Sequence, residues 1–130
     1  MAEPAKIESV FCRTILDSRG QLSVEVEVRT PVGIGLASAP AGASKGRWEA
    51  VAYPHGGPDE AVKLVRDEVA AALQGLHAQD QRAVDEALRR IDGTENLRKL
   101  GGNTAYAVSL AVAAAAADSL KIPLYQHLGG

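Results

Sequence analysis

LSVEVEVRT, residues 22–30, is the stretch that decides the fold, because apolar and polar residues alternate along its whole length. A period of two is typical of a β-strand that has one buried face and one polar face. The valines at positions 24, 26 and 28 are therefore expected to face the core. The opposite face is expected to carry Ser23, Glu25, Glu27 and Arg29.

Two neighbouring segments extend this strand into a small sheet. Residues 7–15 are rich in β-formers, and the turn-forming run 17–20 joins them to residues 22–30, which predicts an antiparallel hairpin. A second turn at residues 31–33 leads into a third segment, 34–39. We therefore expect three strands in an antiparallel meander.

From Pro58 onward the hydrophobic period changes to that of a helix. Val62, Val65, Val69 and Leu73 recur at helical spacing, and Gly75 is a suitable stop. Further helices are expected over about 80–91, 104–120 and 124–128. Because all strands precede all helices, the order favours an α+β fold, a three-stranded antiparallel meander followed by a helical layer, in one domain spanning residues 1–130.

Composition argues against several classes of partner. The net charge of -2 arises from interspersed acids and bases, without the basic stripe of a nucleic-acid or membrane-surface protein. The longest apolar run, residues 110–117, is too short and too rich in alanine to span a bilayer. Cys12 is the one cysteine, so no internal disulfide can form. These features lead us to expect a cytoplasmic protein that binds neither nucleic acid nor membrane.

The run APAGASKGRWEA, residues 39–50, lies between the last expected strand and the first expected helix. Its glycines, serine and lysine suggest a phosphate-binding loop, but the order Ser44, Lys45, Gly46 does not match the P-loop sequence. By composition alone the segment is best interpreted as an ordinary flexible connector.

Several separated stretches of the chain match one family in the correct order. DSRGQLSVEVE at 17–27 is similar to the family's DSRGNPTVEVE, and PAGASKG at 40–46 is similar to PSGASTG. Residues 92–101 match DGTENxxxLG, residues 108–113 match VSLAVA, and residues 122–130 match IPLYQxLGG. The chain therefore resembles the amino-terminal domain of enolase over nearly its whole length, which implies the same strand-then-helix fold.

The resemblance carries expectations about activity. Enolases interconvert 2-phosphoglycerate and phosphoenolpyruvate in glycolysis, using a lysine base and two Mg²⁺ ions. In the family the lysine and the carboxylate ligands lie on a carboxy-terminal barrel that this chain does not contain. The resemblance thus implies a capping domain that is inactive alone, has no catalytic residue of its own, and works with a barrel, in cis or in trans, on a small phosphorylated acid.

The family's amino-terminal domain contributes a mobile flap. The serine at the position of Ser44 ligates the second Mg²⁺ in the family, as suits a hard cation that takes oxygen ligands. Glycines 42 and 46 would be the hinges of such a flap. The resemblance assigns the flap to Ala41, Gly42, Ala43, Ser44, Lys45 and Gly46.

The chain departs from the family pattern in and after this loop. Ala41 replaces a serine, Lys45 replaces a threonine, and residues 51–57, VAYPHGG, lack the family's acidic and arginine residues. These changes leave two alternatives open: a diverged stand-alone binding or assembly module, or part of a related lyase acting on another phospho- or phosphonate acid. His55 is interpreted as a surface loop residue.

Two charged residues on the expected strands have a further implied role. In the family, residues at the positions of Arg13 and Glu25 form ion pairs between subunits, which implies a homo-oligomer. From the sequence alone the same two residues are equally consistent with a charge pair between neighbouring strands. Arg19 and Glu49 also match family positions, and we interpret them as supporting their loops.

Overall fold

The computed structural model describes residues 5–40 and 46–130 of the chain. Its sheet has three antiparallel strands in the order β1-β2-β3, which confirms the predicted meander. The register places Arg13 opposite Glu25 and Val26 opposite Ala37. The strands are β1 (Ser9–Leu16), β2 (Leu22–Arg29) and β3 (Ile34–Ser38).

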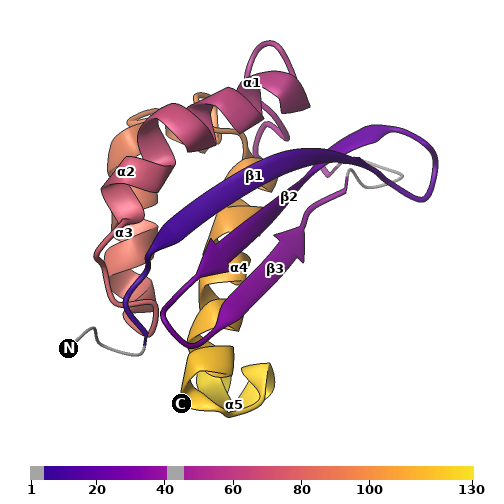
Figure 1. The fold of residues 1–130 in the computed structure, drawn as a ribbon. Helices are drawn as coiled ribbons and strands as arrows, with labels where there is room; N and C mark the ends of the chain where they lie inside the picture. Colours follow the sequence, from indigo (N-terminus) through magenta and orange to yellow (C-terminus); the bar gives the residue numbers. More distant parts are fainter. Residues whose placement is uncertain (1–4, 41–45) are drawn as a thin grey trace.

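One face of the sheet is covered by helices, as Figure 1 shows. The long helix α4 (Gly102–Leu120) packs across β2 and β3, and the helix that begins at Pro58 packs along β1. Val24, Val26 and Val28 face this helical layer and are fully buried, as the alternation predicts. The α+β class is therefore confirmed.

The helix over residues 58–73 is continuous but contains one wider turn. It consists of α1 (Pro58–Leu64), the π-helical turn η1 (Val65–Val69) and α2 (Ala70–Leu73). In this turn the Ala70 amide donates to the Val65 carbonyl, five residues back. Val65, Val69 and Leu73 are fully buried, so the π turn keeps the predicted apolar positions against the core.

The first of the remaining helices begins and ends at capping signals in the sequence. The carboxylate of Asp80 accepts a hydrogen bond from the Ala83 amide at the start of its helix, and Gly93 ends that helix in the left-handed conformation. These elements are α3 (Gln81–Asp92), the 3₁₀ turn η2 (Glu95–Leu97) and α5 (Leu124–Gly129).

The first strand starts two residues later than predicted. Ile7 does not pair with β2. Its amide instead donates to Leu76 (2.8 Å), and its carbonyl accepts from Gly75 (2.9 Å). The apolar side chain of Ile7 remains 1% exposed, so the β-rich composition of this segment reflects burial against the end of α2.

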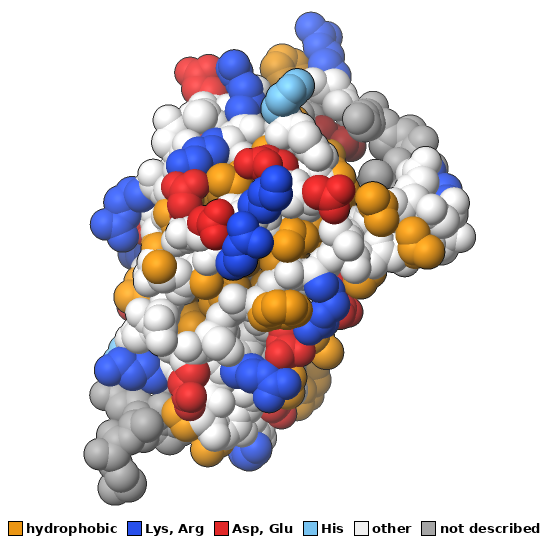
Figure 2. Space-filling view, turned by 45° about the horizontal axis from the view of Figure 1, so that its top comes forward, with side chains coloured by type: hydrophobic (Ala, Val, Ile, Leu, Met, Phe, Trp, Pro, Cys, Tyr) orange, Lys and Arg blue, Asp and Glu red, His pale blue; other side chains and the backbone are white. Residues whose placement is uncertain are grey.

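Charge is evenly mixed on the surface that Figure 2 presents, where Lys and Arg side chains alternate with Asp and Glu. This agrees with the absence of a basic stripe in the sequence. No helix within the described residues is long and apolar enough to cross a membrane.

Candidate functional site

Most of the segment that the sequence marks as a flap lies outside the described residues. Its borders are described: Ala39 is buried at the end of β3, and Gly46 is exposed. The predicted flap residues Ala41, Gly42, Ala43, Ser44 and Lys45 fall outside the described part of the chain. The site can therefore be built from the two ends of this loop.

A short turn follows the segment. The Gly46 amide donates to the Glu49 carboxylate (2.8 Å), and the Glu49 amide donates back to the Gly46 carbonyl (3.3 Å). Glu49 thus supports its loop, as the sequence indicated. The turn presents Trp48, which is 88% exposed, with the guanidinium of Arg47 at 5.1 Å from its ring centroid.

The chain then packs against the amino terminus of α4. The amides of Gly102 and Asn103 donate to the carbonyls of Val51 (2.5 Å) and Ala52 (2.9 Å). These bonds satisfy two of the amides that a helix start leaves unpaired. They also explain why α4 begins at Gly102 and not at the predicted residue 104.

Gly101 makes this approach possible. It has a φ of +85°, and a β-carbon added there would lie 2.5 Å from the α-carbon of Tyr53. Only a residue without a β-carbon leaves room for a main chain this close. Tyr53 is therefore held at a fixed place beside α4.

Tyr53 reaches back to the start of the loop. Its hydroxyl donates to the Ala39 carbonyl (3.1 Å) and lies 3.2 Å from the hydroxyl of Ser23, which also reaches the Ala39 carbonyl (3.2 Å). We call these three residues the Tyr53 cluster. The cluster connects β2, the end of β3 and the segment that follows the turn at residues 46–49.

The position of Ser23 differs from the prediction. Alternation placed Ser23 on the polar face with Glu25, but Ser23 is 0% exposed because it lies within this hydrogen-bonded group. Sequence reasoning assigned Tyr53 no role. The sequence feature that could have indicated a role is a tyrosine within a Pro/Gly-rich loop, because the hydroxyl of a tyrosine that packs against a protein needs a polar partner. His55 is exposed, as predicted.

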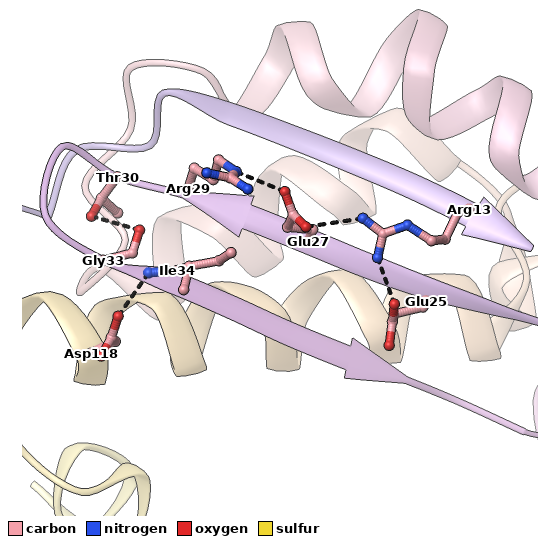
Figure 3. Close-up of polar contacts among 8 residues, drawn as sticks. All are labelled: Arg13, Glu25, Glu27, Arg29, Thr30, Gly33, Ile34 and Asp118. Carbon is pink, nitrogen blue, oxygen red and sulfur yellow. Dashed lines mark hydrogen bonds and ion pairs between the residues drawn. The ribbon is translucent and has the colours of Figure 1, made fainter. Parts of the chain in front are cut away.

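Arg13 and Glu25 meet on the other face of the sheet, where Figure 3 shows them in one row with Glu27 and Arg29. Arg13 contacts Glu25 (2.5 Å) and Glu27 (2.9 Å), and Glu27 also contacts Arg29 (2.7 Å). The charge pair between strands is therefore present. The predicted inter-subunit contact stays a prediction.

Glu27 is the centre of this row. The hydrogen bond from Arg29, followed by the one from Arg13, holds the pKa of Glu27 below its ordinary value. The hydrogen bonds that Arg13 donates to Glu27 and Glu25 in turn raise the pKa of Arg13. Opposite charges are thus matched within the row.

Contacts at the opposite end of the sheet fix β3 against α4. The Ile34 amide donates to the carboxylate of Asp118 (2.9 Å), as Figure 3 shows. Close by, the hydroxyls of Thr30 and Ser119 lie 2.6 Å apart. Together with the Tyr53 cluster, these bonds hold both ends of β3 in place.

Asp92 organises the loop that leads to Gly101. Its carboxylate accepts from the Thr94 amide (3.0 Å), the Thr94 hydroxyl and the Leu100 amide (2.8 Å). Burial would raise the pKa of Asp92, but these hydrogen bonds outweigh burial and lower it. The ionised carboxylate therefore fixes the approach to α4.

The described residues offer few ligands for a metal ion. Within residues 5–40 and 46–130, no group of three or more His, Cys, Asp or Glu side chains could hold a metal ion. The described residues do not by themselves fit a Mg²⁺ ion, which prefers an octahedral set of oxygen ligands.

Comparison with known proteins decides the family. Residues 7–128 match the family described as the enolase N-terminal domain. The chain belongs to this family. The recognised motifs and the observed meander followed by helices agree with that membership.

Enolases from distant organisms are similar to this enolase-type domain. The enolase of Methanothermobacter thermautotrophicus is 53% identical over 124 residues, which is 95% of this chain and 30% of the relative. That of Anaplasma marginale is 51% identical, covering 97% of this chain and 31% of the relative. That of Pyrococcus furiosus is 47% identical, covering 100% and 32%. The chain thus spans about a third of the length of these relatives.

Proposed function

We propose that this chain is the amino-terminal capping domain of an enolase that interconverts 2-phosphoglycerate and phosphoenolpyruvate. The family match over residues 7–128 carries the proposal, together with the short share of each relative that the chain spans. The lysine base and the carboxylate ligands would come from a barrel, in cis or in trans. By this proposal the domain alone does not turn over substrate, and the complete enzyme is a lyase of the cytoplasm.

Ser44 is the proposed contribution of this domain to the site. Its hydroxyl would ligate a Mg²⁺ ion shared with the substrate, and the remaining ligands would come from the barrel, because the described residues do not provide them. When bound, Mg²⁺ would supply charge stabilisation for the anionic intermediate. The flap would run from Ala41 to Gly46, with Arg13 and Glu25 at the contact in a homo-oligomer.

Two departures from the family support a second candidate. Ala41 and Lys45 replace hydroxyl residues in the flap, and residues 51–57 carry no acidic or arginine side chain. In the structure this altered segment packs on the start of α4 through Val51 and Ala52. A stand-alone binding or assembly module, or a lyase for another phospho- or phosphonate acid, would keep this packing and lose 2-phosphoglycerate turnover.

A reconstitution assay tests the proposal. The chain is supplied with 2-phosphoglycerate and Mg²⁺, alone and together with the carboxy-terminal part of the Methanothermobacter enolase, and phosphoenolpyruvate is measured. Turnover is expected in the mixture and not with the chain alone. A mixture that binds but does not turn over would favour the second candidate.

A matched pair of variants tests the serine. Ser44→Ala is expected to lower turnover and to raise the Mg²⁺ concentration needed for half-maximal rate. Ser9→Ala, an exposed serine at the start of β1, serves as the control and is expected to change neither quantity. Equal behaviour of the two variants would contradict the role of Ser44.

A further inference from the structure

The two ends of the loop that carries Ser44 are joined through one side chain. Ala39 precedes the loop and Tyr53 follows it, fourteen residues later, with the Tyr53 hydroxyl 3.1 Å from the Ala39 carbonyl. Ser23 adds a second hydroxyl to the same carbonyl at 3.2 Å. The Ala39 carbonyl thus accepts hydrogen bonds from two side chains.

The Tyr53 end is itself fixed by main-chain contacts. The carbonyls of Val51 and Ala52 accept hydrogen bonds from the first amides of α4, and the main chain of Tyr53 lies close against Gly101. Tyr53 also packs against the hydrophobic core. The Tyr53 hydroxyl is therefore held in place to donate to the Ala39 carbonyl.

Ser23 and Ala39 of the Tyr53 cluster are buried, so their hydrogen bonds are costly to lose. Ser23 is fully buried and Ala39 is 5% exposed, so water does not readily replace a lost hydrogen bond at either group. Phenylalanine would preserve the packing of the ring at position 53 but not the bond. The hydroxyl of Tyr53 thus has a role that its ring does not share.

We propose that Tyr53 is a positioning residue, whose hydroxyl fixes the main chain at Ala39 and so sets where the segment bearing Ser44 begins. This rests on the proposed function of Ser44. Tyr53 acts through Ala39 and is not a catalytic residue. Small displacements of a catalytic or metal-binding group cost large factors in rate, so such a constraint matters for turnover.

Amide hydrogen exchange tests the structural step on the chain itself. Tyr53→Phe is expected to speed exchange of the amides at the end of β3 and in the turn 46–49 about five- to tenfold, the loss of one buried hydrogen bond. Exchange at Val26 in the centre of the sheet is expected to stay unchanged. Unchanged exchange at the end of β3, or an equal rise at Val26, would overturn the proposal.

Two further variants separate positioning from general destabilisation. Tyr106→Phe removes a hydroxyl from a 57% exposed ring on α4 and is the matched control, with no change expected at the end of β3. Ser23→Ala is expected to speed exchange at the same amides as Tyr53→Phe. In the double variant the effects are expected to be less than additive in free energy, because both hydroxyls belong to one cluster. Strict additivity would count against a shared role.

Turnover by the reconstituted enzyme provides a second test of the role of Tyr53. With 2-phosphoglycerate and Mg²⁺, Tyr53→Phe is expected to lower kcat about tenfold, while its thermal unfolding midpoint equals that of Tyr106→Phe. An unchanged kcat would overturn the positioning role. If the wild-type mixture shows no turnover, the proposed function fails, while the exchange experiment still decides whether Tyr53 fixes Ala39. The two failures are therefore distinguishable.

Discussion

Gly35 of β3 lies directly against the main chain of α4 at Ala111. A β-carbon added at Gly35 would overlap the Ala111 carbonyl oxygen and lie 3.0 Å from the carbonyl carbon of Ala114. The contact is between two main chains, which explains why the helix is so rich in alanine along this stretch. The sheet and the helix can approach only because both surfaces lack large side chains.

Gly35→Ala is therefore expected to destabilise the domain strongly. The methyl group meets main-chain atoms that cannot rotate away, so the free energy of unfolding should fall by about 3 kcal/mol, the upper end of ordinary overpacking costs. Urea unfolding followed by circular dichroism measures the change. Gly129→Ala is the control, since a β-carbon at Gly129 meets no atom within 4 Å. Equal stability of the two variants would contradict the close packing.

Glu27 is expected to contribute more to stability than Glu25. Glu27 binds Arg13 and Arg29 with its side chain 17% exposed, whereas Glu25 binds Arg13 alone and is 30% exposed. Glu27→Gln should lower the free energy of unfolding by about 1 kcal/mol, and Glu25→Gln should lower it by less. Urea unfolding in low and high salt measures both, with the smaller salt dependence expected for the Glu27 pairs.

The same carboxylate has a defined pH dependence. Because Arg29 and Arg13 hold its folded pKa below the ordinary value, Glu27 stabilises the fold fully above about pH 4.3 and loses that contribution as the pH falls through the folded pKa. The difference in stability between the protein and Glu27→Gln should therefore shrink below pH 4.3. A difference that stays constant down to pH 3 would contradict the ion pairs.

Asp92→Asn is expected to loosen the approach to α4. The amide nitrogen of asparagine cannot accept from the Leu100 amide, so a buried donor loses its partner at a cost of about 2 kcal/mol at pH 7. Since the folded pKa of Asp92 is lowered, its stabilisation is present above about pH 3.9 and is lost as the pH falls through the folded value. Chemical unfolding at pH 7 and pH 3 should show a smaller difference between the protein and the variant at pH 3 than at pH 7.

The exposed pair of Glu86 and Arg89 gives a control for this variant. Nη1 of Arg89 lies 3.8 Å from Oε2 of Glu86, and both side chains are more than half exposed. Glu86→Gln should therefore change the free energy of unfolding by a few tenths of a kcal/mol at most. A cost as large as that of Asp92→Asn would show that any loss of negative charge destabilises this domain, and that the hydrogen bonds of Asp92 are not the cause.

The sequence predicted those features that depend on local periodicity. Alternation in 22–30 placed the three core valines correctly, and Gly93 marked the end of α3, because each signal lies within one element. The burial of Ser23 was missed, since its partner Tyr53 lies thirty residues away. The proposed role of Ser44 rests on family resemblance, because a lone loop serine has no local pattern that distinguishes a metal ligand from a solvated hydroxyl.

Trp48 is expected to report on the surface of the turn at residues 46–49. It is the one tryptophan in the chain and is 88% exposed, so its fluorescence should be that of a water-exposed indole and should shift little when urea unfolds the domain. The guanidinium of Arg47 lies over its ring, which should favour the approach of anions. Iodide is therefore expected to quench the fluorescence more strongly than caesium does. Arg47→Ala should reduce this difference, whereas Arg82→Ala, a change on the distant helix α3, should leave it unaltered. An emission maximum that is blue-shifted in the native protein would contradict the exposed position of Trp48.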